Sequence, residues 1–212
     1  MTNFIPVFPL AIVVFPGEDL NLHIFEPRYK QLITDCHQQK KPFGIPSVLN
    51  QELKELGTLL EISEIKKIYD DGKMDIRTKA VKVFRMLEQI HEIPGKLYSG
   101  AIVTYPLDTD DGNSLLMQKV ISSIKELHTI LEVKKDFKKP EPQLKAFDVA
   151  HHLGLTLEEE YELLGLFREA QRQEYLKRHL SKVLRMLGQM EDLKEKVKLN
   201  GHFKNLQSFN FD

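Results

Sequence analysis

The segment Glu26-Pro27-Arg28-Tyr29 holds the side chains whose types and spacing best suit binding of a charged ligand. The planar guanidinium of Arg28 could hold a carboxylate of a bound chain through two parallel hydrogen bonds. A second interpretation needs no ligand, because Pro27 suits the first position of a helix and the free N–H groups there must be satisfied. We favour this second interpretation, in which Glu26 caps the helix and Arg28 forms a local ion pair, and we leave the first open.

Histidine and cysteine give little support for metal binding or nucleophilic catalysis. Of the eight histidines, only His151 and His152 are close in sequence. Helical neighbours point about 100° apart, unlike the i, i+4 pair of a helical zinc site. The single cysteine, Cys36, falls on the apolar face of the helix predicted after Pro27, with no evident basic activation nearby. We expect a buried, unreactive thiol and no metal site.

No motif of a nucleotide-binding or hydrolytic enzyme occurs in the sequence. The phosphate-binding string GxxxxGK[ST], the dinucleotide-binding string GxGxxG and the nucleophile string GxSxG are all absent. A small-molecule hydrolase would also need a pocket of converging polar groups, which the sequence does not indicate. We therefore predict a protein with no catalytic residue and no cofactor.

The overall charge argues against nucleic acid as the main partner. The 212 residues include 30 Lys and Arg against 31 Asp and Glu, which gives a net charge of -1. Proteins that bind nucleic acid usually carry a basic excess, because neutralising phosphates supplies much of the affinity. The lysines of residues 134–139 are more typical of a solvated loop than of a phosphate site. A local basic patch would survive a neutral total, so a nucleic-acid-binding module stays open as the alternative.

The N-terminal segment is apolar but does not have the form of an export signal. Pro6 and Pro9 interrupt the apolar run, and no basic residue precedes it. No stretch approaches the ~20 apolar residues of a membrane-spanning helix. A single cysteine cannot form an internal disulfide, which suits a reducing compartment. We expect a cytoplasmic protein without membrane contact.

The first half of the sequence is typical of short strands and turns. Between Phe4 and Tyr105 the apolar residues mostly alternate, as in a half-buried strand. Asp71-Gly72 is a strong hairpin signal, because Gly accepts the positive φ of a tight reversal. One helix, which begins at Pro27, interrupts the strands. The pattern predicts a compact β-barrel domain that covers residues 1–112, with its β-rich part ending near Leu107.

The second half, residues 113–212, is typical of helices. Asn113 or Ser114 would cap the first helix, a second would span Gln143 to Leu153, and Thr156 with Glu159 matches a capping box. A long helix from Arg168 would pack on the bundle through a seam and end at Asn200-Gly201. The seam consists of Leu176, Leu180, Val183, Leu187 and Met190. The apolar tail of residues 201–212 is expected to fold back onto this chain or onto another subunit.

The order of these features resembles the N-terminal domain of Lon proteases, in its free-standing bacterial form. The string "FPLAIVVFPGEDLNLHIFEPRY" is similar to that family's opening, and "GTLLEISEI", Asp71-Gly72 and "IRTKAVKVFRMLE" are similar to its later strands. The resemblance covers about residues 4–187. One departure is that Ala80 and Val83 stand where the family usually has Gly and Arg.

The resemblance implies an α+β fold, a β pseudo-barrel related to PUA domains followed by a helical bundle with a long C-terminal helix. It also implies a non-enzymatic module that binds unfolded polypeptides or a protein partner, such as a protease that acts in trans. Because PUA-like barrels often bind RNA, an RNA-binding module is the alternative; self-association is left open. Apolar side chains near the opening motif and the hairpin, with one arginine, are the candidate binding residues: Phe15, Phe25, Arg28, Tyr69 and Met74.

Overall fold

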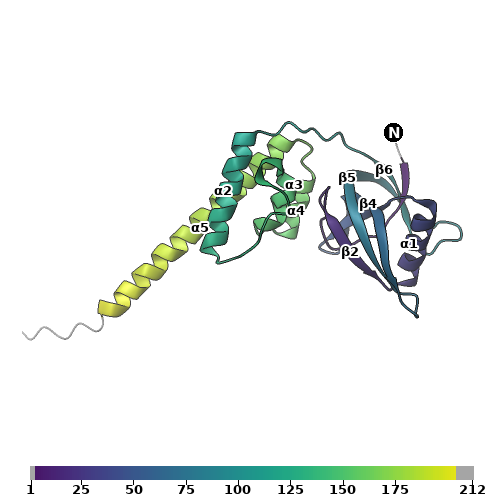
Figure 1. Ribbon diagram of the computed structural model, residues 1–212, viewed down its shortest axis with the longest axis horizontal. Helices are drawn as coiled ribbons and strands as arrows, with labels where there is room; N and C mark the ends of the chain where they lie inside the picture. Colours follow the sequence, from purple (N-terminus) through teal and green to yellow (C-terminus); the bar gives the residue numbers. More distant parts are fainter. Residues whose placement is uncertain (1–2, 204–212) are drawn as a thin grey trace, which may run out of the picture.

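The computed structural model describes the backbone of residues 3–203 and the side chains of residues 3–198. A β-rich half comes first, a helical half follows, and a long C-terminal helix extends away from both (Figure 1). The expected α+β class, with an antiparallel sheet before a set of helices, is confirmed. Within residues 3–203, no helix is both long and apolar enough to cross a bilayer.

The β half is an antiparallel sheet of six strands with one helix packed against it. Its elements are β1 (Asn3–Pro6), β2 (Asp19–Ile24), α1 (Pro27–Gln39), β3 (Phe43–Leu49), β4 (Glu52–Ile68), β5 (Met74–Ile90) and β6 (Gly100–Thr104). The strand order is β1-β6-β5-β4-β3, and β2 pairs with β5 beside this path. After β1, the chain bridges to β3 through Val7–Gly44 and Leu10–Ser47. These bridges curl the sheet into the expected pseudo-barrel.

Helix α1 begins and ends where local chemistry predicts. Pro27 occupies its first turn, and Lys40 ends it in the left-handed region at φ 52°. Its buried face, which packs into the barrel core, consists of Tyr29, Leu32, Ile33 and Cys36. Burial raises the pKa of the Cys36 thiol to about 12, so the expected buried thiol is confirmed and thiolate is scarce at neutral pH.

Strands β4 and β5 form a long hairpin that turns at Gly72, which has a φ of 75° as the Asp-Gly signal predicts. The hairpin bends at a β-bulge, where Leu59 pairs with Lys82 and Leu60 pairs with Ala80, so that one residue of β5 is left over. The backbone N–H of Ala80 donates to the carbonyl of Glu18 at 2.8 Å. The bulge therefore forms with alanine at position 80.

The helical half consists of short helices around two longer ones. The elements are α2 (Ser114–Ile130), the 3₁₀ turn η1 (Glu141–Gln143), α3 (Ala146–Val149), the 3₁₀ turn η2 (Ala150–His152), α4 (Leu157–Leu164) and α5 (Glu169–Phe203). Asn113 caps α2, and Thr156 and Glu159 form the predicted capping box at α4. Both caps satisfy N–H groups that would otherwise lack partners.

The single helix predicted from Gln143 to Leu153 is wrong. The chain forms η1, then α3, then η2, and Leu144 is extended between the first two (φ -72°, ψ 135°). A new helix begins after it, because the Asp148 carboxylate accepts the backbone N–H of Lys145 at 3.0 Å. This local cap competes with a continuous helix and divides the segment.

Helix α5 departs from the expected seam at its outer end. Leu176 and Leu180 are buried, whereas Met190 is 57% exposed, so packing on the bundle stops near Leu187. The helix then continues past the expected stop at Asn200-Gly201 to Phe203. Its exposed apolar stripe consists of Met186, Met190, Leu193 and Val197. The rest of the predicted tail, residues 204–212, lies outside the described residues.

The two halves share one hydrophobic core. Val13, Phe15 and Leu56 come from the β half, yet they pack in the same buried cluster as the helices. Val83 of β5 packs against this cluster. The junction is therefore apolar at its centre.

Candidate functional site

Two of the predicted binding residues are buried. The ring of Phe15 is fully buried and stacks on the ring of Phe147, with centroids 5.0 Å apart. Met74 is buried in the barrel core with Ile76, because alternate residues of a strand point to the same face. The expectation that Phe15 and Met74 are exposed is wrong, and neither contributes to a surface that a partner could reach.

Phe25 and Tyr69 instead lie together at the end of the β4–β5 hairpin, where β2 also ends. Phe25 is 58% exposed. The ring of His23 lies beside both, with its centroid 6.2 Å from Phe25 and 5.9 Å from Tyr69. The Lys67 Nζ atom lies 4.3 Å from the Tyr69 ring centroid. We call His23, Phe25, Lys67, Tyr69 and Asp75 the hairpin-end patch.

Asp75 fixes the rings of the hairpin-end patch. Its carboxylate accepts the Tyr69 hydroxyl at 2.6 Å and lies 2.7 Å from Nδ1 of His23. The hydrogen bond from Tyr69, followed by that from His23, lowers the pKa of the Asp75 carboxyl. The hydrogen bond to Asp75 raises the pKa of the Tyr69 hydroxyl. The patch therefore presents two held rings and a fixed negative charge beside the exposed ring of Phe25.

His23, Lys67 and Asp75 were not predicted as site residues. They are cross-strand neighbours, because His23 pairs with Asp75 and Asp75 pairs with Lys67 in the sheet register. The hairpin signal at Gly72 would have placed Lys67 near Asp75. The pairing of β2 with β5 has no comparable signal in the sequence.

Arg28 is engaged locally. Its Nη2 and Nε atoms lie 2.8 and 2.9 Å from one Glu26 carboxylate oxygen, and its guanidinium carbon lies 4.5 Å from the Tyr29 ring centroid. The expected local ion pair is confirmed. The expected cap is wrong, because the Glu26 side chain caps no backbone N–H and pairs with Arg28 instead.

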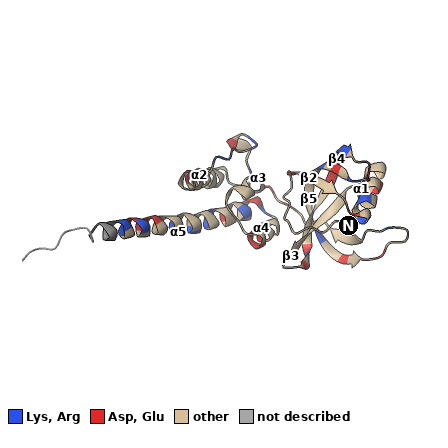
Figure 2. Cartoon of the chain, turned by 90° about the horizontal axis from the view of Figure 1, so that it is seen from below, with Lys and Arg blue, Asp and Glu red and all other residues tan. Residues whose placement is uncertain are grey.

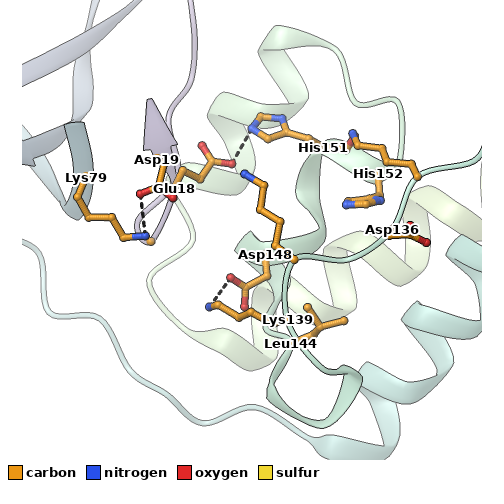
Figure 3. A pocket seen from close by; sticks show the side chains of 12 residues that line it. Glu18, Asp19, Lys79, Asp136, Lys139, Leu144, Asp148, His151 and His152 are labelled. Atoms are coloured by element: carbon orange, nitrogen blue, oxygen red, sulfur yellow. Dashed lines mark hydrogen bonds and ion pairs between the residues drawn. The ribbon is translucent and has the colours of Figure 1, made fainter. Parts of the chain in front are cut away.

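A cavity of about 350 Å³ lies where the two halves meet. Figure 3 shows Glu18, Asp19 and Lys79 of the β half on one side and His151 of the helical half opposite. The two ring nitrogens of His151 lie 2.8 Å from Glu18 and 2.7 Å from Glu160. The hydrogen bond to Glu160, followed by that to Glu18, raises the pKa of His151 to about 9.

The cations that line this cavity are mostly held by the protein itself. Lys79 pairs with Asp19 at 3.2 Å, and Lys139 pairs with Asp148 at 2.6 Å. Lys135 donates to the carbonyl of His151 at 2.6 Å. Since these charges and donors already have partners, the geometry is that of a polar junction between the halves.

His152 also lines this cavity, and its side chain packs against other aromatic rings. Its ring lies between those of His128 and Phe137, at centroid distances of 5.5 and 4.9 Å. Burial, with a smaller contribution from the Lys135 charge, lowers its pKa to about 4. In the described part of the chain, no group of three or more His, Cys, Asp or Glu side chains is arranged to hold a metal ion.

The fold and sequence match a known family. The family model described as the ATP-dependent protease La (LON) substrate-binding domain matches residues 5–182. The crystal structure of a Lon N-terminal domain protein from Xanthomonas campestris is similar, with a TM-score of 0.64 and 24% identity over 83% of this chain and 98% of that one. The N-terminal domain of a Mycobacterium avium complex Lon protease is also similar, with a TM-score of 0.61 and 14% identity over 84% of this chain and 98% of that one. The chain belongs to the family of Lon substrate-binding domains.

Proposed function

We propose that this chain is a polypeptide-recognition module that binds apolar segments of unfolded or partner proteins through the hairpin-end patch. The observation that carries this proposal is the exposed ring of Phe25 beside the held rings of His23 and Tyr69. Held rings lose little conformational entropy when they bind, and a large exposed aromatic side chain is a typical anchor of protein interfaces. The match to a substrate-binding family supports the same conclusion.

The charges around the patch suit a polypeptide. The Lys67 ammonium beside the rings can contact a carbonyl or carboxylate group of a partner. Asp75, which is already bonded to Tyr69 and His23, adds a fixed negative charge beside it. A rim of charged and polar groups around an aromatic centre is the usual anatomy of a protein interface. An unfolded chain offers this surface apolar side chains together with free backbone groups.

Binding of RNA, the alternative function, would need unpaired cations beside stacking rings. On the β half, acidic and basic side chains are mixed (Figure 2). In the hairpin-end patch, Lys67 lies opposite Asp75 in the sheet register, and elsewhere on the β half Lys79 pairs with Asp19 at 3.2 Å. The electrostatic attraction for phosphate is therefore offset locally, and polypeptide is the proposed ligand.

Fluorescence anisotropy tests the proposal with a labelled protein kept unfolded by reduction and alkylation of its disulfides. The native form of the same protein serves as the comparison. We expect binding of the unfolded form only, and Phe25→Ala should weaken it about tenfold or more, as for an interface anchor. Phe4→Ala is the matched control, because Phe4 is 50% exposed on β1, away from the patch.

Two results would contradict the proposal. One is equal affinity of Phe25→Ala and the unaltered protein for the unfolded probe. The other is tighter binding of a labelled single-stranded RNA, with an affinity that falls steeply as salt is raised.

A further inference from the structure

Strand β2 has one edge without a strand partner. It pairs with β5 from Asp19–Lys79 to Ile24–Met74, and no second strand joins it in the sheet described over residues 3–203. Among the helices and strands of that region, only β5 makes extensive contact with it. A free edge presents a row of backbone N–H and C=O groups to which another chain can pair.

The hydrogen bonds on the β5 side identify which residues face outward. The Glu18 carbonyl accepts the backbone N–H of Ala80 at 2.8 Å, and the Leu20 carbonyl accepts the Thr78 hydroxyl at 2.9 Å. In an antiparallel strand, the N–H and C=O of one residue point to the same side, and the side alternates from one residue to the next. The backbone groups of Asp19, Asn21 and His23 therefore point away from β5, toward the free edge.

This edge lacks the features that usually prevent strand pairing. It has no proline, no lysine and no bulge, and its one charged residue, Asp19, is the first. The outer half of β4, residues 61–68, also lacks a second partner but is rich in charge and carries two register shifts. Charges and bulges discourage pairing at an edge. The β2 edge is therefore the more receptive of the two.

The free edge connects the two regions described above. Asp19, at one end, lines the cavity between the halves, and His23, at the other end, belongs to the hairpin-end patch. Figure 1 shows β2 on the side of the barrel nearest the helical half. At ~3.4 Å per residue, the strand offers about 20 Å of edge.

We propose that an extended segment of unfolded polypeptide binds as an additional strand along β2, paired with the outward backbone groups of Asp19, Asn21 and His23. This inference rests on the proposed function and adds its mode: backbone pairing supplies sequence-independent affinity, and the hairpin-end patch selects an apolar or aromatic side chain next to Phe25. Backbone pairing of this kind lets one surface accept many sequences, as recognition of unfolded chains requires.

The test uses the full chain and a labelled ten-residue peptide of alternating valine and threonine. Asn21→Pro removes the outward N–H of Asn21 and places a ring on the edge, while the ladder bonds to β5 are kept, a position where proline is tolerated. Asn21→Ala is the matched control, because it keeps the N–H. We expect Asn21→Pro to bind the peptide at least about tenfold more weakly than the unaltered protein does. Asn21→Ala should bind it with the same affinity as the unaltered protein.

A second measurement needs no variant and decides the matter if Asn21→Pro does not fold. Hydrogen exchange followed by NMR should slow on peptide binding at the amides of Asn21 and His23, and change little at Leu20 and Leu22, which already face β5. The same peptide with four consecutive N-methylated central residues has lost its central N–H donors on both edges and carries methyl groups there, so it should bind at least about tenfold more weakly.

The outcomes separate this inference from the proposed function. Strand addition is overturned if Asn21→Pro or the N-methylated peptide binds as well as its unaltered counterpart, or if exchange at Asn21 does not change. If Phe25→Ala nevertheless weakens binding of the unfolded protein, the proposed function stands without strand addition. If the unaltered protein binds neither the peptide nor the unfolded protein, both are wrong.

Discussion

The Nε2 atom of His151 lies 2.8 Å from a carboxylate oxygen of Glu18, and this contact ties the helical half to the β half. The other ring nitrogen lies 2.7 Å from Glu160, so one imidazolium ring bridges two carboxylates from different parts of the fold. Beneath it, the rings of Phe15 and Phe147 stack. The junction between the two halves therefore has an apolar centre, and a titratable side chain, His151, lies over it.

We expect the junction to weaken as the pH rises toward alkaline values. The pKa of His151 is raised to about 9 in the folded protein, from about 6.5 in an unfolded chain. Its contribution is therefore complete below pH ~6.5 and is lost as the pH rises through about 9. The melting temperature should fall over this window, and His151→Gln should remove that part of the fall.

The matched control for this experiment is His91→Gln, because His91 is exposed on the β half. It should leave the pH profile of the melting temperature as it is. A fall of equal size between pH 6.5 and 9 in His151→Gln would show that His151 is not its source. Because the His151 side chain is 41% exposed, we expect a modest effect, as for a partly screened ion pair.

Substitutions of Phe15 and Phe25 should distinguish a residue that stabilises the fold from one that serves binding. Phe15→Ala removes a fully buried ring from the core shared by both halves, and it should lower the free energy of unfolding by about 3–5 kcal/mol. Phe25→Ala removes an exposed ring and should change it by less than about 0.5 kcal/mol. Urea denaturation measures both, and a large loss in Phe25→Ala would show that its ring supports the fold.

The buried pair of Arg172 and Glu169 should be costly to break. Arg172 Nε lies 2.9 Å from the Glu169 carboxylate, and the two side chains are 4% and 2% exposed. Arg172→Met leaves a buried charge without its cation and should cost about 3–5 kcal/mol in urea denaturation. Adding Glu169→Gln should restore much of this loss, since the amide oxygen can still accept the backbone N–H of Ala146.

Arg178→Met is the control for that experiment. Arg178 also pairs with a glutamate on α5, Glu174 at 3.2 Å, but its side chain is 79% exposed. Its loss should cost no more than about 0.5 kcal/mol. Similar losses for Arg172→Met and Arg178→Met would contradict the argument from burial.

We propose that the purified protein turns over neither ATP nor peptide bonds. The sequence holds no phosphate-binding loop, and Cys36 is buried with a pKa of about 12. Phosphate release and cleavage of a fluorogenic peptide should stay at the level of a buffer blank. Turnover that follows the protein through successive columns and disappears in a point variant would refute this expectation.

Local signals predicted much of the fold. The capping box of Thr156 and Glu159, the turn at Gly72 and the helix start at Pro27 all formed as expected. Each depends on backbone geometry and on hydrogen bonds within a few residues, which the sequence specifies directly. The single helix predicted from Gln143 to Leu153 does not form for the same kind of reason, because Asp148 caps a new helix that begins after Lys145.

The candidate site was harder to predict, because exposure depends on partners that are distant in the sequence. Phe15 is covered by Phe147, and nothing near Phe15 indicates this. The burial of Met74 follows from strand alternation with Ile76, so the sequence pattern could have predicted it. The apolar seam of α5 predicted which face of that helix is buried. The length over which this face is covered depends on where α2 ends, at Ile130, and the seam does not indicate this.

The unsupported part of α5 has a consequence for small-angle X-ray scattering. Among the side chains described, residues 3–198, Leu187 is the last one of α5 that packs on the bundle, and from there the helix backbone extends about 24 Å to Phe203, at 1.5 Å per residue. A compact chain of 212 residues would have a radius of gyration of about 17 Å. A rod attached to such a body adds long interatomic vectors without adding much mass. The distance distribution of the monomer should therefore rise to an early maximum and decline in a long, skewed shoulder.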